Sequence, residues 1–283
     1  MVGRISRPAR HFFQGVRWIN LLLIALYYIV ARYVFFFSVP LDQYLELAGA
    51  TLLIAAGGNL ENDLRDVLVD KANRKPNFFQ SGINRKKAFL PYLLYVAGWV
   101  LGSRLGWQTG KPWAFFYFAS VIILLVNYNI ALKKMPLIGN FVVSFLTALS
   151  VFQPAFFFDL PAPAARRLVF LAVLVFLANL NREIIKDITD RKGDRLAGFQ
   201  TLGVISVRTA LQTAFAGNLL LTLTLAAYAL FNRGPIGRMY FGLLAVATAA
   251  TGWYLTRGRK NLALIKNIYK WIILAGIAGI MLR

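Results

Sequence analysis

The sequence has no cysteine and only one histidine. Without cysteine the chain can form no disulfide, no thiolate metal site and no cysteine nucleophile. We interpret the single histidine, His11 in the N-terminal arm, as an interface residue rather than a base, so no conventional catalytic triad is available. Acidic residues are also scarce, because 11 Asp and Glu stand against 32 Lys and Arg. Carboxylate chemistry is therefore confined to a few positions.

The excess of basic residues gives a formal net charge of +21. These residues are spread over the connections between apolar segments, and no recognisable nucleic-acid-binding module accompanies them. We therefore expect no nucleic-acid partner. Much of the charge is assigned instead to membrane topology and to contacts with anionic membrane lipids.

Apolar residues make up 58% of the chain, and its mean hydropathy is +0.59. A soluble globule of this composition would expose more apolar surface than water tolerates, so the sequence predicts an all-α polytopic membrane protein. Nine apolar stretches approach the length that a helix needs to cross about 30 Å of hydrocarbon. They cover residues 18–37, 44–64, 88–106, 113–132, 137–157, 167–187, 208–231, 238–256 and 264–282.

The connections between these stretches are short, and no low-complexity linker appears. We expect a single transmembrane domain over residues 1–283. Residues 1–17 are basic and lack a small-residue cleavage site after a short apolar core, so we interpret them as a retained cytoplasmic arm.

The distribution of Lys and Arg predicts the orientation of the chain in the membrane. Placing the N-terminus in the cytoplasm assigns 23 basic residues to cytoplasmic segments and 7 to the opposite side. The C-terminus is then expected outside. Both of the acidic clusters described next are expected on the cytoplasmic side.

Eight of the 11 acidic residues fall into two clusters, and each cluster contains four positions spaced by four, three and four residues, the first of them an asparagine in the first cluster. At about 100° per residue this spacing places those four positions on one face of a helix. In the first cluster the spacing joins Asn59, Asp63, Asp66 and Asp70, with Glu61 and Asn62 beside them. In the second it joins Glu183, Asp187, Asp190 and Asp194.

Carboxylates on one helix face repel one another and are costly at a membrane edge unless something compensates them. Mg²⁺ is the natural compensator, because it prefers oxygen ligands and bridges to substrate phosphates. Cations accompany both clusters, as a diphosphate leaving group would require. They are Lys71, Arg74 and Lys75, and Arg182, Lys186, Arg191 and Arg195. The alternative is that these are solvated charges that pair locally.

Two motifs resemble those of a known family. NDLRDVLVD at 62–70 is similar to the NDxxDxxxD motif of the UbiA superfamily of intramembrane prenyltransferases, and DRKGD at 190–194 is similar to its DxxxD motif. The nine spans, with a motif ending the second and the sixth, match as well. More narrowly, residues 182–203 resemble the geranylgeranylglycerol-phosphate geranylgeranyltransferase branch.

The resemblance implies transfer of a prenyl group from an isoprenoid diphosphate to an acceptor, with two Mg²⁺ ions bound between the motifs. The implied metal ligands are Asn62, Asp63, Asp66, Asp70, Asp187, Asp190 and Asp194. Of these we expect Asp66, Asp70, Asp190 and Asp194 to be catalytic, together with Tyr128, whose ring could stabilise an allylic cation. The expected diphosphate-binding residues are Lys71, Arg74, Lys133, Lys186 and Arg195. Tyr128 and Lys133 are assigned because YNIALKKMPLIGN at 128–140 looks like the family's helix 4 to 5 connection.

The chain departs from the family pattern at two places. Lys192 stands where the family often has an acidic residue, and Asn77 to Gly82 replace the usual Arg-Pro-x-x-Ser-Gly, which removes a cation. Both changes leave the implied metal ligands in place. The expected acceptor is a prenylglycerol phosphate, and an aromatic acceptor of the quinone or chlorophyll type is the alternative. A divalent-cation transporter is the alternative of another class.

Overall fold

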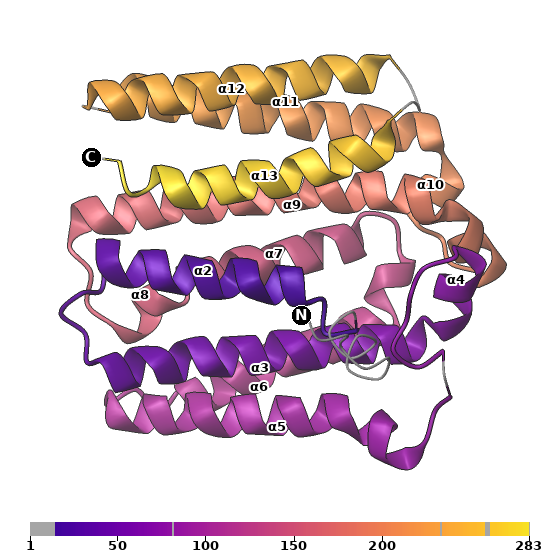
Figure 1. Cartoon of the computed structure of the whole chain (residues 1–283), viewed down its shortest axis with the longest axis horizontal. Coiled ribbons are helices and arrows are strands. Elements are labelled where there is room, and N and C mark those ends of the chain that lie inside the picture. The colour runs from indigo at the N-terminus through magenta and orange to yellow at the C-terminus, as the bar shows by residue number, and fades with distance from the viewer. Residues whose placement is uncertain (1–14, 81, 233, 258–260, 283) are drawn as a thin grey trace, which may run out of the picture. The chain divides into compact units, whose positions relative to one another are not determined.

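The computed structural model describes residues 15–80, 82–232, 234–257 and 261–282. His11 and the N-terminal arm up to residue 14 lie outside these ranges. In the described segments the chain forms α-helices and one short 3₁₀-helix, η1, and no β-strand (Figure 1). The elements are α2 (Trp18–Val34), α3 (Leu41–Arg65), α4 (Val67–Ala72), α5 (Arg85–Gln108), α6 (Ala114–Ile130), η1 (Leu132–Lys134), α7 (Ile138–Phe152), α8 (Pro154–Phe157), α9 (Ala162–Leu196), α10 (Leu202–Ile205), α11 (Val207–Phe231), α12 (Pro235–Thr256) and α13 (Leu262–Gly279).

The helices fit a membrane protein. Four of the described helices, α5, α9, α11 and α13, are long and apolar enough to cross a bilayer, and α2, α6 and α7 are shorter apolar helices. The prediction of an all-α integral membrane protein is confirmed. The number of nine spans stays a prediction, because length and composition qualify only these four within the described ranges.

The helices group into two compact units. The first unit lies within residues 1–29 and 38–132, and the second within residues 30–37 and 133–283. This grouping does not test whether the chain behaves as one domain, which stays a prediction.

In the first unit α3 packs against α5 and α6, and α5 also packs against α6. Gly98 lets α3 and α5 approach closely, because a Cβ atom there would lie 2.7 Å from Ile54 Cγ1 and 2.9 Å from the Ala50 carbonyl oxygen. Leu47, Leu60 and Leu105 are fully buried in this unit. The polar end of α3 is thereby fixed by apolar packing along the rest of the helix.

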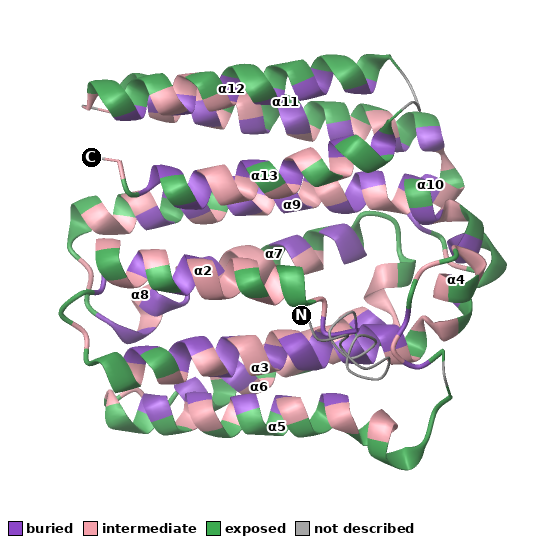
Figure 2. Cartoon of the chain, viewed as in Figure 1, coloured by how far each residue is buried: buried purple, intermediate pink, exposed green. Residues whose placement is uncertain are grey.

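In the second unit α9 packs against α7, α10, α11 and α13. Its 35 residues include buried positions along most of its length (Figure 2), among them Leu168, Leu171 and Leu174, which are fully buried. Asn218 and Tyr269 join α11 to α13 through a 2.9 Å hydrogen bond from the Tyr269 hydroxyl. Ile184, Ile185 and Ile188 are buried in the C-terminal part of α9, which carries the second acidic cluster.

Candidate active site

The first acidic cluster does not lie on one continuous helix. The prediction of a single helical face from Asn59 to Asp70 is wrong, because α3 ends at Arg65, Asp66 has φ −101° and ψ 16°, and α4 begins at Val67. The Asp63 carbonyl, which a continuous helix would offer to residue 67, accepts the side-chain amide of Asn77 at 2.7 Å. The following loop therefore contacts the chain at the break. Regular spacing could not reveal this break, because it depends on a contact with that loop.

Asn77 is a site residue that the sequence did not identify. It is buried, and its amide nitrogen donates to the Asp63 carbonyl and, at 2.8 Å, to Asp70 Oδ2. Its own Oδ1 accepts the backbone N–H of Phe79 at 2.8 Å. The sequence marked this position only as the loss of an arginine. In the structure the amide ties the loop to both sides of the helix break and orients the Asp70 carboxylate.

Arg17 is the second residue that the sequence missed. Its guanidinium donates to Asn62 Oδ1, and it lies 3.9 Å from Asp63 Oδ1. Asp63 also accepts the backbone N–H of Phe78 through Oδ2, at 3.2 Å. In the sequence Arg17 is one of several basic residues at positions 1–17. No sequence pattern marks it, because the contact joins residues 45 positions apart.

Asn62 and Asp63 are buried, whereas Asp66 and Asp70 are partly exposed. Burial raises the pKa of the Asp70 carboxyl above its ordinary value, although the hydrogen bond from Asn77 acts in the opposite direction. A carboxylate whose charge is disfavoured by burial gains most from a cation beside it. A cation bound beside Asp70 would therefore stabilise its carboxylate.

The second acidic cluster lies on one uninterrupted helix. Glu183, Asp187, Asp190 and Asp194 all belong to α9, which extends to Leu196. The predicted stripe is confirmed, and the helix continues more than two turns beyond the predicted end of the span at 187.

Neutral hydrogen-bond donors lie beside the aspartates of this cluster. Asn140 Nδ2 donates to Asp187 Oδ2 and Thr201 Oγ1 to Asp194 Oδ2, both at 3.1 Å. The Thr189 hydroxyl lies 3.1 Å from Asp190 Oδ1, but its one proton also faces the Lys186 carbonyl oxygen at 2.8 Å. The bonds from Asn140 and Thr201 thus orient the carboxylates of Asp187 and Asp194.

Glu183 behaves differently from these aspartates. It is buried and pairs with Arg182 at 2.5 Å and with Lys186 at 2.9 Å. Lys186, which we expect to bind diphosphate, is thus held by the Glu183 carboxylate. Lys186 lies one helical turn before Asp190 on α9. The cation is positioned beside the carboxylate stripe by a local ion pair.

The segment around η1 lies beside the second cluster within the second unit. The Lys134 carbonyl accepts the backbone N–H of Gln200 at 2.9 Å, and its ammonium lies 5.6 Å from the centre of the Phe199 ring. Together with the bond from Asn140 to Asp187, these contacts place Lys133 on a segment attached to the second motif. Tyr128 lies in the first unit, on α6, and is partly exposed.

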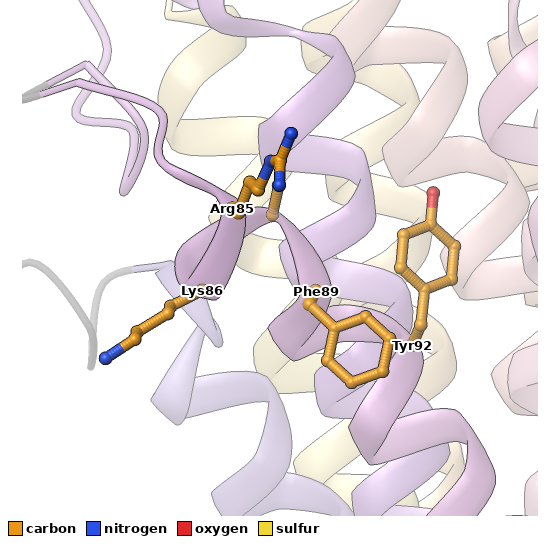
Figure 3. A pocket seen from close by; sticks show the side chains of 5 residues that line it. Arg85, Lys86, Phe89 and Tyr92 are labelled. Atoms are coloured by element: carbon orange, nitrogen blue, oxygen red, sulfur yellow. The ribbon is translucent and has the colours of Figure 1, made fainter.

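The other expected diphosphate-binding cations, Lys71, Arg74 and Arg195, are exposed. A hollow at the start of α5 contains none of the predicted site residues (Figure 3). It is lined by Arg85, Lys86, Ala88, Phe89 and Tyr92. Basic residues followed by aromatic ones are typical of a membrane–water interface, so we do not assign this hollow to the active site.

The donor atoms of both motifs suit Mg²⁺. Within residues 15–80, 82–232, 234–257 and 261–282, no three acidic or histidine side chains converge on one point. Mg²⁺ is commonly held by only one or two carboxylates together with water and substrate phosphates, so a closed cage is not required. In each motif taken by itself, the carboxylate oxygens, and in the first motif also the Asn62 amide oxygen, are of the kind that such a metal takes as ligands.

Comparisons with known proteins agree with these motifs. Residues 21–273 match the model of the UbiA prenyltransferase family. Digeranylgeranylglyceryl phosphate synthase from Thermococcus kodakarensis is 35% identical over 191 residues, which cover 68% of this chain and 66% of that protein. The chain thus aligns with about two thirds of the relative's length.

Solved structures share the fold. One described as digeranylgeranylglyceryl phosphate synthase in membranes has a TM-score of 0.72 and 19% identity, over 98% of this chain and 99% of the other. A UbiA homologue from Archaeoglobus fulgidus bound to GPP and Mg²⁺ has a TM-score of 0.63 and 14% identity, over 96% and 100% of the two chains. At these identities the likeness concerns the fold alone. From the family match over residues 21–273, the chain belongs to the UbiA prenyltransferase family.

Proposed function

We propose that this protein transfers a prenyl group from an isoprenoid diphosphate to a prenylglycerol phosphate and releases diphosphate, with Mg²⁺ as cofactor. The observation that carries the proposal is the set of oriented carboxylates in both motifs, in a chain 35% identical to a digeranylgeranylglyceryl phosphate synthase. Because the alignment covers 66% of that relative, its acceptor is proposed for this chain from similarity and chemistry together.

In the proposed reaction the bond between the allylic carbon and the diphosphate oxygen breaks and its electron pair leaves with the diphosphate. The acceptor hydroxyl forms the new C–O bond, and its proton passes to the released diphosphate or to water. When bound, Mg²⁺ neutralises the charge that develops on the diphosphate. The proposed metal ligands are Asn62, Asp63, Asp66, Asp70, Asp187, Asp190 and Asp194. That both motifs serve one substrate is part of this proposal.

Basic side chains bind the diphosphate oxygens in this proposal. To Lys71, Arg74, Lys133, Lys186 and Arg195 we add Arg17, which contacts Asn62 and Asp63. Tyr128 offers its ring to the developing allylic cation. Apolar helices exclude water, which protects that cation from hydrolysis.

The test is turnover by the purified protein in detergent or lipid. Geranylgeranyl diphosphate is offered with a prenylglycerol phosphate and, separately, with an aromatic acceptor; diphosphate release and product mass are measured. We expect the ether product with the first acceptor, loss of activity with EDTA and its return with Mg²⁺. A prenylated aromatic product would instead indicate an acceptor of the quinone or chlorophyll type. Divalent-cation flux without diphosphate release would support a transporter.

We also propose that the N-terminus and both motifs face the cytoplasm and that the C-terminus lies outside. The support is the 23 to 7 distribution of basic residues. Since the chain has no cysteine, a single introduced cysteine reports only its own position. In inside-out vesicles, Lys192→Cys should react with an impermeant maleimide and Lys111→Cys should not. The reverse pattern would contradict the orientation.

A further inference from the structure

Glu61 is a fully buried carboxylate that no motif position accounts for. It lies on α3 directly before Asn62 and is 0% exposed. Its Oε1 accepts from Arg65 through Nε at 3.0 Å and through a terminal nitrogen at 2.8 Å. Its Oε2 accepts from the Tyr95 hydroxyl at 2.9 Å and from Asn129 Nδ2 at 3.2 Å.

These four donors occupy both carboxylate oxygens of Glu61. They come from α3, α5 and α6, which pack together in the first unit (Figure 1). An ionised buried carboxylate needs such donors to remain stable. A carboxylate already served by four donors is poorly suited to bind a metal. Glu61 is therefore expected to act through its neighbours.

The network passes from Glu61 to Asn62 through Asn129. The Asn129 amide nitrogen donates to Glu61 and to the Gly58 carbonyl, the latter at 3.3 Å. Its oxygen is thus directed to Asn62 and accepts Asn62 Nδ2 at 3.3 Å. Because the Asn62 amide nitrogen donates to Asn129, Asn62 Oδ1 points away from Asn129, and Arg17 contacts it there.

The direction of this chain of amides follows from the chemistry of Glu61. A carboxylate can only accept, so Asn129 must present its nitrogen to Glu61 and its oxygen to Asn62. Asn62 must then present its nitrogen to Asn129 and its oxygen to the site. The oxygen is the atom that can bind Mg²⁺, whereas the amide nitrogen cannot.

We propose that Glu61 is a positioning residue, whose buried carboxylate fixes the amide of Asn129 and thereby holds Asn62 Oδ1 in the orientation required of a metal ligand. This inference rests on the proposed function, because it assigns Asn62 to the Mg²⁺ and diphosphate site. It gives a role to an acidic residue that the spacing of the first cluster leaves unexplained.

The first test is Glu61→Gln, which keeps size and shape but adds a donor. Arg65 requires an acceptor, so the new amide nitrogen lies opposite Asn129. Asn129 is then expected to turn its oxygen to Gln, and Asn62 in turn to present its nitrogen to the site. We expect the Mg²⁺ concentration for half-maximal stabilisation by inorganic pyrophosphate, measured by thermal unfolding, to rise about tenfold to a hundredfold. kcat should fall, while KM for the prenyl diphosphate changes less.

The matched control is Tyr95→Phe. It also removes one hydrogen bond from Glu61 Oε2, but it leaves the bond from Asn129 in place. We expect it to lower the unfolding temperature without ligand, as Glu61→Gln does, and to leave the Mg²⁺ requirement within about twofold of wild type. A purely structural role for Glu61 would make the two variants alike.

A double variant that restores the direction of the hydrogen bond between residue 129 and Asn62 provides a second test. In the double variant E61Q/N129D, the new carboxylate at 129 accepts from Gln at 61 and from Asn62, so Asn62 Oδ1 again faces the site. Recovery should be partial, because the Gly58 carbonyl loses its donor. If Glu61→Gln does not fold, Asn129→Ala removes the same link while Arg65 and Tyr95 still bind Glu61, and it should raise the Mg²⁺ requirement similarly.

The possible outcomes separate this inference from the proposed function. An unchanged Mg²⁺ requirement in Glu61→Gln, or equal shifts in Glu61→Gln and Tyr95→Phe, would overturn the positioning role while wild type still binds Mg²⁺ and pyrophosphate. If wild type itself shows neither this binding nor prenyl transfer, the proposed function and the positioning role fall together.

Discussion

The two acidic motifs have the same spacing but are built on different backbones. Around Asp66 the chain breaks between α3 and α4, and Asp70 is tied to the following loop by Asn77. In the second motif Asp187, Asp190 and Asp194 follow one another along the uninterrupted helix α9. The geometry of the first motif thus depends on a loop, whereas that of the second depends mainly on the helix. Equal spacing in sequence does not imply equal sensitivity to mutation.

The largest expected effect is the same in both motifs. We expect Asp66→Ala and Asp190→Ala each to reduce kcat by about a hundredfold or more, because each removes a proposed metal ligand. Prenyl transfer by purified, folded protein is the measurement. Asp159→Ala is the control, since Asp159 is an exposed acidic residue outside both clusters and should leave turnover unchanged. Normal turnover in either motif variant would remove that aspartate from the metal site.

The second-largest difference is expected between the residues that donate hydrogen bonds to the two motifs. Asn77→Ala leaves the Asp63 carbonyl and Asp70 without their shared donor, so we expect a loss of about 1–3 kcal/mol in unfolding free energy and roughly tenfold in turnover. Thr201→Val removes one bond to Asp194, which α9 still positions, and should cost about 1 kcal/mol or less, with a smaller change in turnover. Thermal unfolding and kinetics test both variants. Equal effects would contradict the view that the first motif depends more on its loop contact than the second.

A smaller difference is expected when the basic residues beside the two motifs are replaced. Lys71 is exposed, whereas Lys186 is held by Glu183 at 2.9 Å. We expect Lys71→Ala to raise KM for the prenyl diphosphate about twofold, because an exposed charge is screened by salt. Lys186→Ala should raise it about fivefold, because a held cation loses less side-chain entropy on binding. Initial-rate kinetics at two salt concentrations provide the measurement, and a larger effect of Lys71→Ala would reverse the assignment.

The smallest expected effect is a change in unfolding temperature when Asp70 is replaced in the absence of metal. Because burial raises its pKa in the folded protein, the ionised carboxylate destabilises the fold. This destabilisation is absent below the ordinary carboxyl pKa, grows as pH rises through that value and is complete above the raised pKa. In EDTA at neutral pH, Asp70→Asn should therefore raise the unfolding temperature slightly, and the gain should disappear at low pH. A lower unfolding temperature at neutral pH would contradict this sign.

The sequence by itself determined the class of the protein and the positions of its carboxylates. Apolar composition and span length predicted an all-α membrane protein, because the backbone inside lipid must satisfy its own hydrogen bonds. The spacing of Asp187, Asp190 and Asp194 correctly predicted one helix face, because within a single helix the angular position of a residue depends only on its number.

Only the tertiary structure decided how the first motif is supported. The break at Asp66 and the contacts of Arg17 and Asn77 arise from segments that fold back onto α3. The bond from Asn129 to Glu61 joins residues 68 positions apart. Helical periodicity carries no information about such contacts, because they depend on which helices pack together and on where buried polar groups find their partners.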